Sequence, residues 1–83
     1  MRNGRLWRAD TCSVELRGQH YRLRLVEFST GWLASIDTAD GPTLGYDRSP
    51  YLAVGQAIDP VGGETVDAIR LTAAAHRVPV LSA

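Results

Sequence analysis

The residues that could act as nucleophiles or general acid–bases are Cys12, His20 and His76, beside several serines and nine carboxylates. The cysteine falls on the apolar side of an alternating run, so we expect a small core residue, because a buried thiol has a raised pKa and reacts slowly. His20 adjoins a predicted hairpin turn, and His76 lies near the carboxyl end of a predicted helix, where a cation is favoured. Local position explains all three residues, and the sequence predicts no catalytic residue and no enzyme.

The usual motifs of cofactor and metal sites are missing from the chain. It has no phosphate-binding glycine loop, no Gly-x-Ser-x-Gly and no His-Glu-x-x-His. A single cysteine offers no paired thiol ligands, and Asp37, Asp40 and Asp47 fall at turn positions where aspartate is common. We therefore predict no bound metal and no cofactor.

The net charge is zero, but the charges are unevenly distributed along the chain. Residues 1–24 carry six arginines and two acids, whereas residues 25–83 carry three arginines and seven acids. Arg2, Arg5, Arg8 and Arg24 are therefore candidate contacts to the phosphates of a nucleic acid. A pI of about 6.7 is low for such a domain. Nucleic-acid binding is therefore kept as the alternative function.

A chain of 83 residues has room for one domain. Residues 11–83 carry the regular patterns, and residues 1–10 form an arm that is either flexible or folded across the sheet. Neither a secretory signal nor a membrane span is predicted, and a lone cysteine suits a reducing cytoplasm. The absence of lysine beside abundant alanine, glycine and arginine indicates a GC-rich bacterial source.

Apolar and polar residues alternate in the runs 11–17 and 20–25, which is the period of two typical of half-buried strands. Gly18 and Gln19 separate the runs, and a two-residue loop with glycine first favours a tight hairpin. This loop would pair Leu16 with Tyr21 and Glu15 with Arg22.

A third alternating run, residues 32–37, pairs with the second if their apolar faces coincide. Leu25 then lies beside Ala34 and Val26 beside Leu33. The same register brings Arg22 next to Asp37. With Glu15 on the other side, Arg22 would form the centre of a cross-strand charge triad.

Residues 43–47 predict a short fourth strand with Leu44 and Tyr46 directed inward. A helix then begins with Ser49 as the N-cap and Pro50 in the first turn, and its apolar stripe consists of Tyr51, Val54, Gly55 and Ile58. A second helix is predicted over about residues 64–77, with a buried side made of Val66, Ile69 and Ala73. Residues 78–81 form either an edge strand or a packed tail.

These elements predict an α+β fold, a three- or four-stranded antiparallel sheet with one or two helices packed on one face. Three strands followed by a helix, with Gly45 and Asp47 before a Ser-Pro helix start, resemble the compact HicB-like domains of bacterial antitoxins. The resemblance covers about residues 11–60, including Ala53 and Ala57 of the helix. It implies a small oligomeric binding protein and identifies no functional residue.

Val26, Phe28 and Leu33 fall together on the side of the sheet that the helices do not cover. Monomeric proteins seldom expose such a cluster, so either the amino-terminal segment with Leu6 and Trp7 covers it, or another protein does. We therefore predict a small protein that acts through protein contacts, as a homodimer or as a subunit of a larger assembly.

Overall fold

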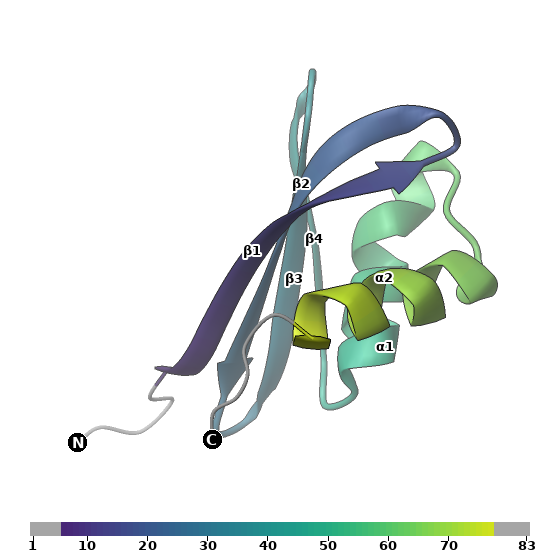
Figure 1. Ribbon diagram of the computed structural model, residues 1–83. Helices are drawn as coiled ribbons and strands as arrows, with labels where there is room; N and C mark the ends of the chain where they lie inside the picture. The colour runs from purple at the N-terminus through teal and green to yellow at the C-terminus, as the bar shows by residue number, and fades with distance from the viewer. Residues whose placement is uncertain (1–5, 78–83) are drawn as a thin grey trace.

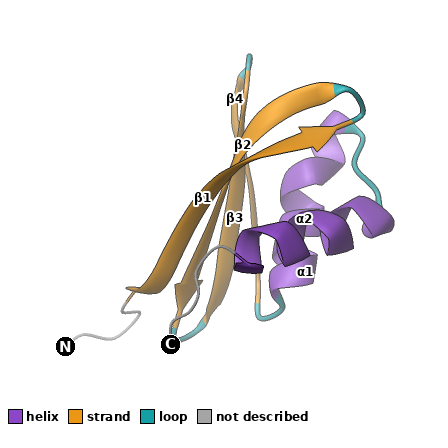
Figure 2. Ribbon diagram, in the orientation of Figure 1, coloured by secondary structure: helices purple, strands orange, loops and turns teal. Residues whose placement is uncertain are grey.

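Four consecutive strands form one antiparallel sheet in the order β1-β2-β3-β4, and two helices follow. The computed structural model describes residues 6–77. Figures 1 and 2 show a two-layer α+β arrangement in which both helices lie on the same face of the sheet. The elements are β1 (Leu6–Leu16), β2 (Gln19–Phe28), β3 (Gly31–Thr38), β4 (Gly41–Asp47), α1 (Pro50–Ile58), the 3-10 turn η1 (Asp59–Val61) and α2 (Thr65–Arg77).

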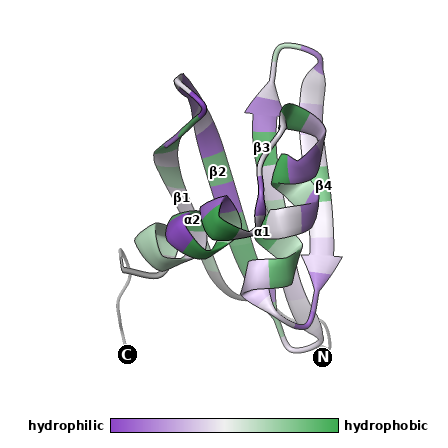
Figure 3. Ribbon diagram, turned by 90° about the vertical axis from the view of Figure 1, so that its right-hand side faces the viewer, coloured by the Kyte–Doolittle hydropathy of each residue, from purple (hydrophilic) through white to green (hydrophobic). Residues whose placement is uncertain are grey.

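The core lies between the two layers. Alternate residues of β1, β2 and β3 supply one side of it, and alanines and larger aliphatic residues of the two helices supply the other. In Figure 3 the helices lie in front of the sheet. The buried apolar residues are Val14, Leu16, Leu23, Leu25, Ala34, Ile36, Ala53, Val54, Ala57, Ile58, Ala68, Leu71 and Ala75.

The first hairpin is present, but its loop is one residue earlier than predicted. Arg17 and Gly18 form the turn, with φ values of 53° and 82°, and Leu16 pairs with Gln19. A two-residue turn with positive φ at both positions matches the twist of the strands, and glycine suits its second position. The predicted pairing of Leu16 with Tyr21 is therefore wrong, because Val14 takes that place. The inward faces are preserved, since a change of two residues is one full period of the alternation.

The shift also removes the predicted charge triad. Arg22 pairs with Ser13, while Glu15 pairs with His20. The predicted register of β2 against β3 is confirmed, but its ladder ends at Leu23, so Arg22 and Asp37 are not paired. β1 begins at Leu6, five residues before the predicted strand start and inside the segment assigned to an arm.

β4 presents the opposite face from the one predicted. Leu44 and Tyr46 point away from the helices, and Gly45 is buried. A Cβ at position 45 would overlap the carbonyl oxygen of Ala53 and lie 2.8 Å from the backbone nitrogen of Ala57. Glycine therefore lets α1 approach this strand closely, and this close packing turns the larger side chains outward.

α1 begins as predicted, because the Ser49 side chain accepts a hydrogen bond from the N–H of Leu52 and Pro50 occupies the first turn. Its buried face consists of Ala53, Val54, Ala57 and Ile58. Tyr51 was predicted to belong to that face but is 46% exposed. The small alanines let the helix pack closely on β3 and β4, and the tyrosine is left beside the second helix.

α2 has the predicted extent, but the residues predicted to be buried are exposed. Val66, Ile69 and Ala73 face solvent, whereas the opposite side packs on the core. A Cβ added at Gly55 would lie 3.8 Å from the Cβ of Ala68, which is ordinary contact, so the helices approach each other at two small residues. The buried side of α2 is formed by Ala68, Leu71, Thr72 and Ala75.

Within residues 6–77, no helix has the length and hydropathy needed to cross a membrane. The predicted edge strand or tail at residues 78–81 lies outside the described residues.

Candidate protein-binding face

The face of the sheet opposite the two helices carries the residues predicted to form an interface, and no described helix covers it. β-Register places Val26 beside Leu33, and Leu33 beside Tyr46, in one row across three strands. Neighbouring strands are about 4.8 Å apart, so these side chains lie next to one another. Phe28 follows two residues after Val26 and therefore lies on the same face. All three predicted interface residues are thus brought together.

Two residues that the sequence analysis assigned to the core enlarge this cluster. Leu44 is 61% exposed and Tyr46 is 45% exposed, and both project from β4 on the uncovered side. Leu44 pairs with Ser35, two residues along the strands from the pair of Leu33 with Tyr46 and therefore on the same face. We call the resulting surface the outer patch, which consists of Val26, Phe28, Leu33, Leu44 and Tyr46.

Tyr46 is fixed in position at one end of the outer patch. Its hydroxyl donates a hydrogen bond to Oγ1 of Thr30 over 2.8 Å. A Cβ at position 31 would lie 2.9 Å from the tyrosine hydroxyl, so the ring passes over Gly31 where no side chain intervenes. The outer patch therefore contains an ordered aromatic side chain before any partner binds.

A hollow of about 540 Å³ adjoins the outer patch at the β2–β3 turn. Phe28 forms part of its wall, and Glu27 and Arg48 supply one charge of each sign. Apolar side chains bordered by mixed charges are typical of protein-binding surfaces.

The edge of β4 is less suited to binding another strand than the face is. Pro42 has no N–H to offer, and the N–H of Tyr46 donates to Oε1 of Gln56 over 2.9 Å. These two positions offer no donor to a further strand, and a proline on an edge strand discourages such pairing. Contact through side chains of the outer patch is therefore favoured over extension of the sheet at β4.

Of the four candidate phosphate contacts, only Arg24 has a described side chain, and it is exposed on the same face as the outer patch. Arg24 pairs with Thr11 on one side and with Ser35 on the other. Arg8 is located in β1, opposite Glu27. Arg2 and Arg5 lie outside the described residues.

The residues with catalytic chemistry are not gathered into one site. Cys12 lies on the core side of β1 and packs partly against the core, whereas His20 is exposed on the other side of the sheet. Burial raises the pKa of the Cys12 thiol, and the Asp10 carboxylate raises it further. His76 belongs to the last turn of α2. In the described part of the chain, no three His, Cys, Asp or Glu residues are close enough to hold a metal ion together.

Comparison with known proteins yields no relative, because no family model, no curated protein and no solved structure matches the chain. The resemblance to HicB-like domains stays a prediction.

Proposed function

We propose that this chain is a non-enzymatic protein-binding module that uses the outer patch, either to form a homodimer or to join a larger assembly as a small subunit. The observation that carries the proposal is the apolar face on which Leu44 and Tyr46, 61% and 45% exposed, lie beside the half-buried Val26, Phe28 and Leu33. A small domain with a limited core gains stability when such a face is covered.

Leu44→Asp tests the proposal with little risk to the fold, because this side chain is already mostly in water. Val66→Asp is the matched control, since Val66 is 67% exposed on the helical side. Light scattering after gel filtration measures the mass of each variant, and a tagged chain measures retention of partners from its native cells. We expect Leu44→Asp, and not Val66→Asp, to dissociate the complex.

A chain that stays at 9.0 kDa at high micromolar concentration does not form a homodimer. If, in addition, no protein depends on Leu44 for its retention, the proposal is wrong. Circular dichroism of each variant checks that both changes leave the fold intact.

Nucleic-acid binding is the second candidate, and the position of Arg24 favours it. This exposed arginine lies in one row with Ser35 and Leu44, and within the described residues it makes no ion pair. An exposed guanidinium without a carboxylate partner can contact the phosphates of a nucleic acid.

Fluorescence anisotropy with labelled single-stranded DNA and RNA distinguishes the two candidates. Nucleic-acid binding predicts affinity that falls steeply as salt is raised, and loss of that affinity in Arg24→Glu but not in Leu44→Asp. Absence of binding at about 50 mM salt would exclude this candidate.

A further inference from the structure

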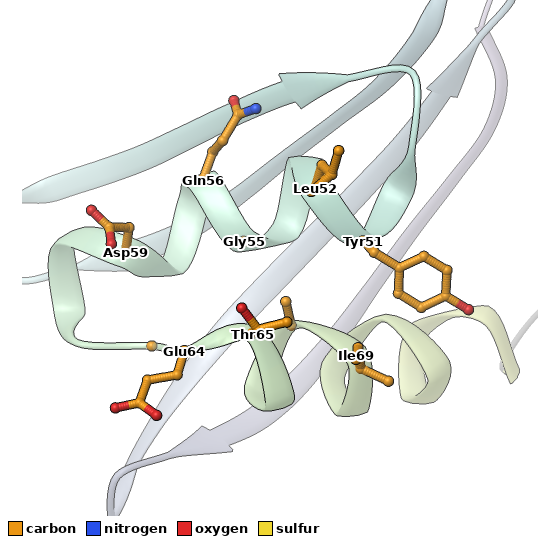
Figure 4. A pocket seen from close by; sticks show the side chains of 10 residues that line it. Tyr51, Leu52, Gly55, Gln56, Asp59, Glu64, Thr65 and Ile69 are labelled. Atoms are coloured by element: carbon orange, nitrogen blue, oxygen red, sulfur yellow. The ribbon is translucent and has the colours of Figure 1, made fainter.

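A second surface, separate from the outer patch, lies on the solvent side of the helical layer. α1 and α2 border a groove of about 680 Å³ whose lining is mostly apolar. Its floor is formed by Gly55 and Ala68, the small residues at which the helices approach each other. Figure 4 shows Tyr51 and Ile69 at one end of this groove and Asp59 and Glu64 at the other. We call it the helix groove.

The apolar end of the helix groove is formed by large side chains that do not pack into the core. Tyr51, Leu52 and Ile69 are 46%, 59% and 51% exposed. α2 therefore carries apolar residues on two sides, one packed on the core and one facing water. Large exposed apolar side chains gathered in a concave surface are typical of binding sites.

The other end of the helix groove is negative. Asp59 and Glu64 are the charged residues that line it, both are exposed, and neither forms an ion pair with a described residue. Asp59 also caps the carboxyl end of α1, where the helix dipole already places partial negative charge. A cation bound here would relieve the negative charge at Asp59, whereas the amino end of α2 already stabilises that of Glu64.

In the described part of the chain, neither Arg17 nor Arg70 forms an ion pair with Asp59 or Glu64. Arg17 directs its guanidinium to the carbonyl oxygen of Gly62, beside the connection between the two helices, and Arg70 binds the carbonyl oxygen of Glu15 and the carboxylate of Asp67. Both carboxylates of the negative end therefore stay open to a cation from outside.

The length of the helix groove sets the distance between the apolar group and the cationic group of a ligand. From Tyr51 to Asp59 the chain advances about 12 Å along a helix, at about 1.5 Å per residue. An extended peptide covers this distance in three to four residues, at about 3.3 Å each.

We propose that the helix groove binds an extended segment of a partner protein in which a large apolar side chain precedes Lys or Arg by three to four residues. The apolar side chain packs between Tyr51 and Ile69, and the cation contacts Asp59 and Glu64. This proposal is independent of the proposed function, because it uses the opposite side of the molecule.

The probe is a short fluorescein-labelled peptide with the order Trp-Gly-Ser-Gly-Arg-Arg, compared with one in which both arginines are glutamates. Anisotropy measures affinity, and amide chemical shifts locate the bound peptide. We expect shifts along residues 51–69 and at least about tenfold weaker binding of the glutamate peptide, a difference of about 1.4 kcal/mol.

Two pairs of variants separate the helix groove from general effects. Glu64→Lys should weaken binding of the arginine peptide by about tenfold, while Asp40→Lys, in the distant β3–β4 turn, leaves it unchanged. Ile69→Ser should weaken binding, while Leu44→Ser on the outer patch does not. Leu44→Asp keeps the peptide affinity of the unmodified chain, so this result is separable from the test of the proposed function.

Three results would overturn the proposal. One is the absence of shifts at the groove amides with millimolar peptide, and another is equal affinity for both peptides. The third is a concentration-dependent shift of the groove amides without peptide, which would identify a second copy of this chain as the occupant.

Discussion

Arg70 and Asp67 connect the helical layer to the sheet and also organise the start of α2. Arg70 donates from Nη2 to the carbonyl oxygen of Glu15 over 3.0 Å and to Oδ1 of Asp67 over 3.3 Å. Oδ2 of Asp67 accepts the N–H of Glu64 over 2.9 Å, which satisfies a donor at the helix terminus. The hydrogen bond from Glu64, with the guanidinium of Arg70, lowers the pKa of Asp67.

Asp67→Asn should lower the melting temperature at neutral pH. The asparagine side chain keeps an acceptor for the N–H of Glu64 but loses the negative charge that attracts Arg70. A carboxyl whose pKa is lowered by folding stabilises the protein above its ordinary pKa of about 3.9, and this contribution is lost as the pH falls through the folded value. The gap in melting temperature between the two proteins should therefore be constant above about pH 5 and shrink below about pH 4.

Thermal melts followed by circular dichroism from neutral to acid pH measure this gap. Asp40→Asn, in an exposed turn, is the control and should melt like the unmodified chain at neutral pH. A gap that persists unchanged at the most acidic pH would show that the charge of Asp67 is not its cause.

Close packing of α1 on β4 is the contact that orients the outer patch. Gly45 and the side chain of Thr43 face the helix, and the hydroxyl of Thr43 donates to the carbonyl oxygen of Ala57. Because successive residues of a strand alternate between faces, Leu44 and Tyr46 must then point to the other side. A single small residue on β4 thus places two large side chains on the outer patch.

Gly45→Ala should destabilise the fold by about 1 to 3 kcal/mol, because the added methyl group overlaps backbone atoms of α1. Gly55→Ala is the matched control, since its Cβ would meet Ala68 at ordinary contact distance. Alanine is favoured over glycine in a helix, so this variant should be unchanged or more stable by up to about 1 kcal/mol. Urea unfolding monitored by circular dichroism measures both effects, and equal stabilities would contradict the packing described for α1.

The molecule as a whole is held together by one core shared between its layers. The buried apolar side chains come from three strands and from both helices, so neither layer buries its apolar face alone. The β1–β2 hairpin also curls toward the helices in Figure 1, where Arg17 meets Gly62 of the connection between α1 and α2. Sheet and helices should therefore be lost together.

Unfolding by urea should give one transition, with the same midpoint by far-ultraviolet circular dichroism and by tryptophan fluorescence. Trp32 packs partly against the core and reports on the sheet, whereas the ellipticity reports mainly on the helices. Midpoints that differ between the two signals would show that one layer unfolds before the other.

The local features of this fold follow from the sequence alone. Alternation of apolar residues predicts the strands, the matching of their apolar faces predicts the register of β2 with β3, and Ser49 with Pro50 predicts the start of α1. Each depends on residues close together in the chain or on one simple rule of alternation. Val26, Phe28 and Leu33 could be placed on one face for the same reason.

Only the tertiary structure decides which side of β4 and of α2 faces the core. α2 carries apolar residues on two sides, so periodicity offers two solutions with similar burial. β4 carries its large apolar side chains on the side that faces away from the helices, so in both elements these side chains suggest the wrong face. Gly45 and Ala68 decide the outcome because small residues allow the backbones to approach. Close approach is a property of two surfaces packed together, and for this reason the exposure of Leu44 and Ile69 could not be read from either segment by itself.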